Sequence, residues 1–87
     1  MAYKVIFDKK AAKVLDRFEK RNKYLFKRIY CEINALSDNL FGGKSLIGDK
    51  KGYFSLRVGD YRIIYSINHS TFQIYILDIS HRKEVYK

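Results

Sequence analysis

The stretch YFSLRVGDYRIIYSI, residues 53–67, decides the fold, because two strand-like runs flank the pair Gly59-Asp60. A Gly-Asp pair between such runs predicts a two-residue β-hairpin turn, and this turn fixes the register of both strands. Val58 is then expected opposite Tyr61. Since side chains alternate between the two faces of a hairpin, one face is predicted to be apolar and suited to a core.

The same register places Arg57 directly opposite Arg62 on the polar face. Like charges in such a cross-strand pair lie roughly 5 Å apart and repel each other. The pair is compatible with a solvated surface. It is also compatible with an anion-binding site, because planar guanidinium groups fit phosphate oxygens.

Composition predicts one folded domain over residues 1–87, because 47% of the residues are apolar and 16% are aromatic. The single cysteine, Cys31, excludes an intrachain disulfide. No signal pattern and no membrane-length apolar run is seen, so a cytoplasmic protein without a membrane partner is expected. The net charge of +9 is shared by both halves of the chain, which favours nucleic acid as the partner.

The first half of the chain predicts a strand and a helical hairpin. Residues 3–7 alternate as a strand, and Asp8 is expected to cap a helix that ends near Lys20. Asn22 is expected to cap a second helix. Its apolar residues repeat at helical spacing: Leu25, Ile29, Ile33 and Leu36.

The second half predicts a glycine-rich loop followed by an antiparallel meander. The loop, residues 41–52, carries Lys44, Lys50 and Lys51, which are candidate contacts to a nucleic-acid backbone. Strands are expected at residues 53–58, 61–67 and 72–79. The fold class is therefore α+β, with the N-terminal strand, the helical hairpin and a three-stranded meander in one small sheet with helices on one face.

The turn NHST, residues 68–71, extends the register to the last strand if Ile67 lies opposite Phe72 and Tyr65 opposite Ile74. Leu77 then lies beside Arg62. An apolar strip is expected on the arginine face, formed by Ile64, Tyr75, Leu77 and Ile79. A partner is expected to cover this strip.

The segment HRKEVYK, residues 81–87, is expected to emerge beside the arginine pair and to bring His81, Arg82 and Tyr86 to it. An imidazole suits proton transfer near neutral pH, and a phenol can donate a proton. Together with guanidinium groups they suit RNA cleavage by 2′-hydroxyl attack, which requires no metal or cofactor. No metal site is predicted, because no carboxylate cluster accompanies His69 and His81.

GYFSLRVGDYRIIYSI and ILDISHRKEVYK, together with the order of elements before them, resemble the RelE/ParE toxin superfamily, specifically its RelE branch. The resemblance covers nearly the whole chain. It implies a toxin that cleaves mRNA in the ribosomal A site and is held inactive by an acidic, RelB-like antitoxin. It also implies phosphate-binding roles for Arg57, Arg62 and Arg82, a functional role for Tyr86 and, as in some members, a role for His81.

The sequence departs from the family pattern at the proton-transfer residues. Phe54 and Ser55 stand where some RelE toxins carry lysines, and Lys44 lies near the place of a glutamate used by others. His81 is therefore the first candidate for the general base, and Tyr86 is the second. Two other functions stay open: a ParE-like gyrase inhibitor that is not a nuclease, and a basic RNA-binding module without catalysis.

Overall fold

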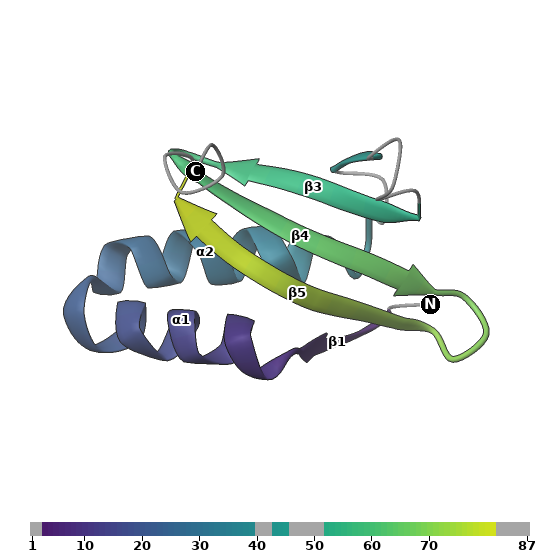
Figure 1. Ribbon diagram of the computed structural model, residues 1–87, viewed down its shortest axis with the longest axis horizontal. Helices are drawn as coiled ribbons and strands as arrows, with labels where there is room; N and C mark the ends of the chain where they lie inside the picture. The colour runs from purple at the N-terminus through teal and green to yellow at the C-terminus, as the bar shows by residue number, and fades with distance from the viewer. Residues whose placement is uncertain (1–2, 40–42, 46–51, 82–87) are drawn as a thin grey trace.

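The computed structural model describes residues 3–39, 43–45 and 52–81 (Figure 1). Its elements are β1 (Lys4–Phe7), α1 (Lys9–Arg21), α2 (Lys23–Ala35), β2 (Lys44–Ser45), β3 (Tyr53–Val58), β4 (Tyr61–Asn68) and β5 (Gln73–His81). The strands form one sheet in the order β1-β5-β4-β3-β2, with β1 parallel to β5 and the other neighbours antiparallel. The predicted α+β class and its antiparallel meander are confirmed. Neither described helix is long and apolar enough to span a membrane.

Asn22 joins the two helices and satisfies backbone groups of both. Its N–H donates to the Phe18 carbonyl oxygen at 2.8 Å, and its side-chain oxygen accepts from the Leu25 N–H at 3.2 Å. This confirms the predicted cap of α2, since a side-chain acceptor at this position satisfies an N–H that the helix leaves unpaired. Asp8 holds the corresponding position before α1, but its side chain makes no capping hydrogen bond.

The two helices cover one face of the sheet, and the core lies between these layers (Figure 1). The helices contribute apolar residues at helical spacing and the strands contribute alternate residues, as one-sided burial of each element requires. The buried residues are Ala11, Leu15, Ile29, Ile33, Leu36, Leu56, Val58, Ile63, Tyr65, Ile74, Ile76 and Ile79. The other face of the sheet is not covered by either helix, and we call it the open face.

The register between β3 and β4 agrees with the prediction. Val58 pairs with Tyr61, and Arg57 pairs with Arg62. Gly59 has a φ of 60°, a left-handed conformation that glycine adopts without a side-chain clash. The two-residue turn therefore fixes which residues of both strands face the helices.

The predicted register between β4 and β5 is wrong near the turn. Ile67 pairs with Ile74 and not with Phe72, because Asn68 still pairs with Gln73 and the four-residue loop is 69–72 instead of the expected 68–71. The Asn68 side-chain oxygen accepts from the N–H groups of Ser70 and Thr71, at 3.0 and 3.2 Å. Side-chain acceptance of this kind stabilises a turn in place of strand pairing.

A β-bulge then shifts the register by one more residue, because Tyr65 pairs with Ile76 whereas Ile64 pairs with Asp78. The extra residue in β5 is Leu77. Ile79, expected on the arginine face, is instead in the core and is 2% exposed. The predicted apolar strip therefore loses Ile79.

Candidate functional site

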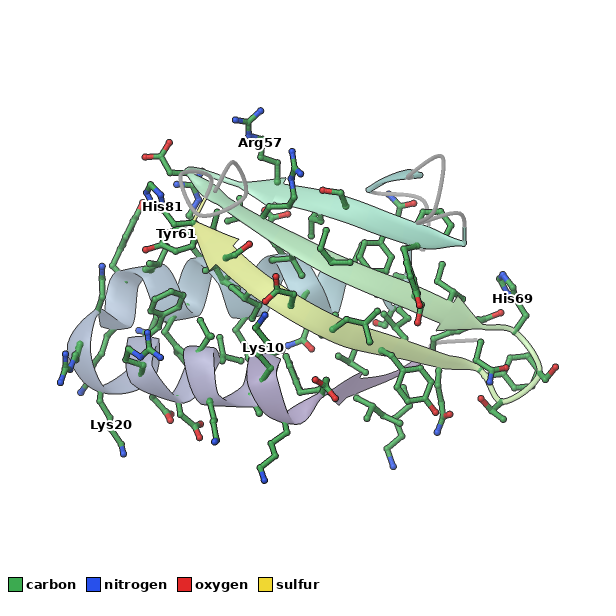
Figure 2. All side chains as sticks on the ribbon, viewed as in Figure 1. Lys10, Lys20, Arg57, Tyr61, His69 and His81 are labelled. Carbon is green, nitrogen blue, oxygen red and sulfur yellow. The ribbon has the colours of Figure 1, made fainter. Side chains whose placement is uncertain are left out.

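The arginine pair lies on the open face, at the end of the sheet where β3 turns into β4. Arg57 on β3 pairs with Arg62 on β4, and Ser80 on β5 is the next residue across. Arg57 is exposed and points away from the sheet (Figure 2), whereas Arg62 is half-buried. Two guanidinium groups on neighbouring strands, with a hydroxyl beside them, can bind the oxygens of one phosphate.

Asp78 is the acidic residue of the open face that the sequence analysis missed. The bulge places it opposite Ile64, and it therefore lies diagonally from Arg62 on the same face. Its carboxylate forms an ion pair with Lys10 of α1, with 3.5 Å between Nζ and Oδ1, and this buried oxygen has no hydrogen-bond partner among the described residues. The ion pair with Lys10 offsets part of the negative charge that Asp78 brings to the open face.

His81 lies at the same end of the sheet, but its side chain is on the face opposite to the arginine pair. It pairs with Tyr61, and the two rings meet edge to face with their centroids 5.1 Å apart. Tyr61 in turn contacts Phe18 of α1 in the same manner, at 5.1 Å. The structure thus places His81 at the expected end of the sheet, but the bulge at Leu77 turns its side chain to the face opposite to Arg62.

The remaining candidate residues lie wholly or partly outside the described structure. Arg82, Tyr86, Lys50 and Lys51 are outside the described residues. Lys44 is in β2, where its Cα pairs with that of Ser55. Lys44 was expected in a loop, and the structure instead has a two-residue edge strand there.

Tyr65 holds this edge strand to the core. The Gly43 N–H donates to the Tyr65 hydroxyl oxygen at 3.1 Å. A Cβ atom at Gly43 would lie 2.6 Å from that oxygen and 2.8 Å from the Ser55 carbonyl oxygen, so only glycine permits this approach. Burial raises the pKa of the Tyr65 hydroxyl above its ordinary value, and the hydrogen bond from Gly43 offsets part of this effect.

Within the described ranges, no group of three or more histidine, cysteine or acidic residues is placed to hold a metal ion. The two histidines lie at opposite ends of the sheet (Figure 2). At the end of the sheet away from His81, the His69 Nδ1 forms a 2.9 Å hydrogen bond with the Tyr3 hydroxyl. His69 therefore belongs to the loop between β4 and β5 and not to the arginine site.

Solved structures of toxins are similar to this chain. One is the RelBE2 toxin–antitoxin complex of Mycobacterium tuberculosis, with 29% identity and a TM-score of 0.78 over 94% of this chain and 100% of that chain. Another is the archaeal RelE–RelB complex of Pyrococcus horikoshii OT3, with 27% identity and a TM-score of 0.73 over 94% of this chain and 97% of that chain. The YoeB dimer of Staphylococcus aureus, at 20% identity, shares the fold with a TM-score of 0.77 over 93% of this chain and 98% of that chain.

No match was found among curated protein sequences. Residues 5–86 match the family described as "ParE toxin of type II toxin-antitoxin system, parDE". This match includes the helical hairpin, every strand from β2 to β5 and all of the candidate site residues. The chain therefore belongs to the ParE toxin family of the RelE/ParE superfamily, and it is the toxin of a type II toxin–antitoxin module.

Proposed function

We propose that the protein is a metal-independent endoribonuclease that cleaves mRNA in the ribosomal A site and so arrests translation. The observation that carries the proposal is the direct opposition of Arg57 and Arg62 on the open face of the sheet. Two cations held together by the hairpin register form a repulsive pair, and a phosphate between them removes the repulsion.

In the proposed reaction the arginine pair binds the non-bridging oxygens of the scissile phosphate. The 2′-oxygen attacks phosphorus as its proton passes to a general base, a new 2′-oxygen–phosphorus bond forms, and the bond to the 5′-oxygen breaks. The leaving 5′-oxygen takes up a proton, and the other product is a 2′,3′-cyclic phosphate. The guanidinium groups stabilise the negative charge that develops on the phosphate oxygens. Arg82 is proposed as a third phosphate ligand.

His81 is proposed as the general base and Tyr86 as the acid. His81 is the last residue of β5 and lies at the arginine end of the sheet. Its imidazole packs edge to face on Tyr61, so it has to turn away from this ring to reach a phosphate held on the open face. Lys44, Lys50 and Lys51 are proposed to contact the RNA backbone without reading its sequence.

The proposed partner is an acidic antitoxin encoded beside the toxin. The M. tuberculosis and P. horikoshii structures are complexes of RelE-type toxins with antitoxins. An acidic segment laid across the open face would neutralise the arginine pair, and its apolar residues would cover the half-buried Ile64 and Tyr75. Such a complex is expected to be catalytically silent.

The decisive experiment is primer extension on an mRNA during translation in a purified system. Wild-type protein is expected to produce cleavage at codons in the A site, and Arg62→Ala is expected to remove it. Arg21→Ala is the matched control, because Arg21 is an exposed arginine at the end of α1 and not a residue of the open face. Intact mRNA with the wild-type protein would contradict the proposal.

A second candidate function is inhibition of DNA gyrase, favoured by the family description, which names ParE. It is separated from the first by a gyrase supercoiling assay. If the protein blocks supercoiling and leaves translated mRNA intact, the gyrase function replaces the ribonuclease.

A further inference from the structure

Four cations form a single row along α1. Lys9, Lys13, Arg17 and Lys20 are all exposed, and their spacing places successive members about one helical turn apart. The residues of α1 that are buried, Ala11 and Leu15, face the sheet. With a rise of about 1.5 Å per residue, the row is about 16 Å long. We call these four residues the α1 cation row.

The row stands in the most basic part of the described chain. Residues 9–35 hold nine lysines and arginines against three acidic residues, which gives +6 of the total net charge of +9. In the part of the chain that the structure describes, the one ion pair joins Lys10 to Asp78, and Lys10 is not a member of the row. Asp16 is also exposed, and it lies three residues after Lys13 and four before Lys20 on the same side of α1, so it offsets one of the four positive charges. The row keeps an excess of positive charge without an ion pair between described residues.

The basic surface continues onto the start of α2. Lys23 and Lys27 are exposed and lie one turn apart, and Tyr24 between them is 77% exposed. An exposed tyrosine ring beside cations is a surface on which a nucleotide base or a sugar can pack.

We propose that the α1 cation row, with Lys23, Tyr24 and Lys27, binds the sugar–phosphate backbone of a folded RNA. Regularly spaced cations on a straight helix match a polyanion whose charges also repeat at regular intervals. An acidic polypeptide fits less well, because protein interfaces are centred on buried apolar residues. Among the described residues, the large apolar side chains that are exposed are Tyr24, Tyr30, Tyr53 and Phe72, and none of them is on α1.

The row and the arginine pair serve different RNA segments. Lys20 points away from the sheet, on the side of the molecule opposite to Arg57 (Figure 2). Both surfaces can therefore be occupied at once, with a folded RNA on the helices and a separate strand on the open face. The inference goes beyond the proposed function, because the row docks the protein and takes no part in cleavage.

The test measures binding of the purified protein to a short 2′-O-methylated RNA duplex, which has no free 2′-hydroxyl, over a range of salt concentrations. The variant Lys13→Gln/Arg17→Gln removes the two central charges of the row. The control Lys4→Gln/Arg28→Gln removes two exposed cations from β1 and α2 and has the same net charge. All four side chains are exposed, so both variants are expected to keep the wild-type melting temperature.

The slope of log affinity against log salt is negative, and each lost phosphate contact reduces its magnitude by roughly 0.9. The magnitude of the slope is therefore expected to be about 1.8 smaller for the row variant than for the wild type. Between 50 and 200 mM salt the wild type then loses roughly 12-fold more affinity than the row variant. The control is expected to keep the wild-type slope. This binding is measured without cleavage, so it succeeds or fails independently of the ribonuclease assay.

Two results would overturn the proposal. Equal losses of slope in the row variant and in the control would mean that binding follows net charge alone. Unchanged duplex binding by the row variant, together with lost binding to polyglutamate, would identify the row as a surface for an acidic polypeptide.

Discussion

Replacing Arg57 or Arg62 by alanine is expected to leave the free protein at least as stable as the wild type while weakening its binding to RNA. The two residues are direct cross-strand partners, so their charges lie roughly 5 Å apart if the side chains stay parallel. In water, two unit charges at this distance repel by about 0.8 kcal/mol. This value is an upper bound, because Arg57 is exposed and its guanidinium can move away.

Relief of this repulsion corresponds to a rise in melting temperature of at most about 3–6 °C for a domain of this size. Either single substitution removes the whole repulsion between the two charges. The double variant Arg57→Ala/Arg62→Ala should therefore show the same rise in melting temperature as one single variant. The stability changes of the single variants are therefore expected not to add. This non-additivity is the signature of a repulsive pair in the free protein.

Binding to RNA is expected to respond in the opposite direction. Hydrogen bonds to a charged group contribute about 1.5–3 kcal/mol each, so losing one guanidinium should weaken binding roughly 10- to 150-fold. Thermal melts and titrations with a 2′-O-methylated single-stranded RNA measure the two effects, with Arg21→Ala as the control. Melting temperatures lowered by more than about 8 °C in both single variants would show that the arginines are structural and would refute the reasoning.

The remaining predictions concern proton transfer, the core and the partner. His81→Ala is expected to lower single-turnover cleavage on ribosomes by roughly 10²- to 10⁴-fold, the usual contribution of a positioned base, and full activity would remove His81 from the mechanism. Because burial raises the pKa of Tyr65, the folded state holds this proton more tightly than the unfolded state, so stability is lost as pH rises past the ordinary tyrosine pKa. In alkaline melts Tyr65→Phe should flatten this loss, whereas Tyr24→Phe, at an exposed ring, should retain it. Co-expression with the adjacent reading frame should give one peak in size-exclusion chromatography, with an association rate that falls with salt; two separate peaks and persistent growth arrest would argue against the antitoxin.

The fold was predictable from the sequence where one or two residues determine the conformation or the pairing of the elements beside them. The Gly59-Asp60 turn allows one register, so the opposition of Arg57 and Arg62 followed from two residues. Asn22 was predictable in the same way, because its side chain caps the helix that begins beside it.

The last strand was not predictable by the same reasoning, because its loop begins one residue later than expected and a bulge adds a residue that strand alternation does not reveal. Asp78 indicates from the sequence where the bulge lies. Strict alternation from Ile74 and Ile76 would place this carboxylate in the core, and a buried charge is costly. An extra residue before Asp78 avoids that cost and buries Ile79 instead, so the position of the bulge could have been found from the sequence.

The candidate site was predictable in part. The arginine pair was expected on a polar face and lies on the open face. His81 was expected at the arginine end of the sheet and lies there, but the face that its side chain takes depends on the bulge, which was not predicted. The Lys10 to Asp78 ion pair joins α1 to β5, and only the three-dimensional packing brings these two residues together.

The parallel pairing of β1 with β5 has a consequence for synthesis of the protein. Lys4 pairs with Gln73, so the first strand has no partner until the last strand has been translated. At about 5–20 residues per second, the chain between them takes roughly 3–14 s to make. A nascent chain that stops before β5 lacks the strand between β1 and β4 and cannot close the sheet. The order of the strands thus delays formation of the complete sheet until β5 has been translated.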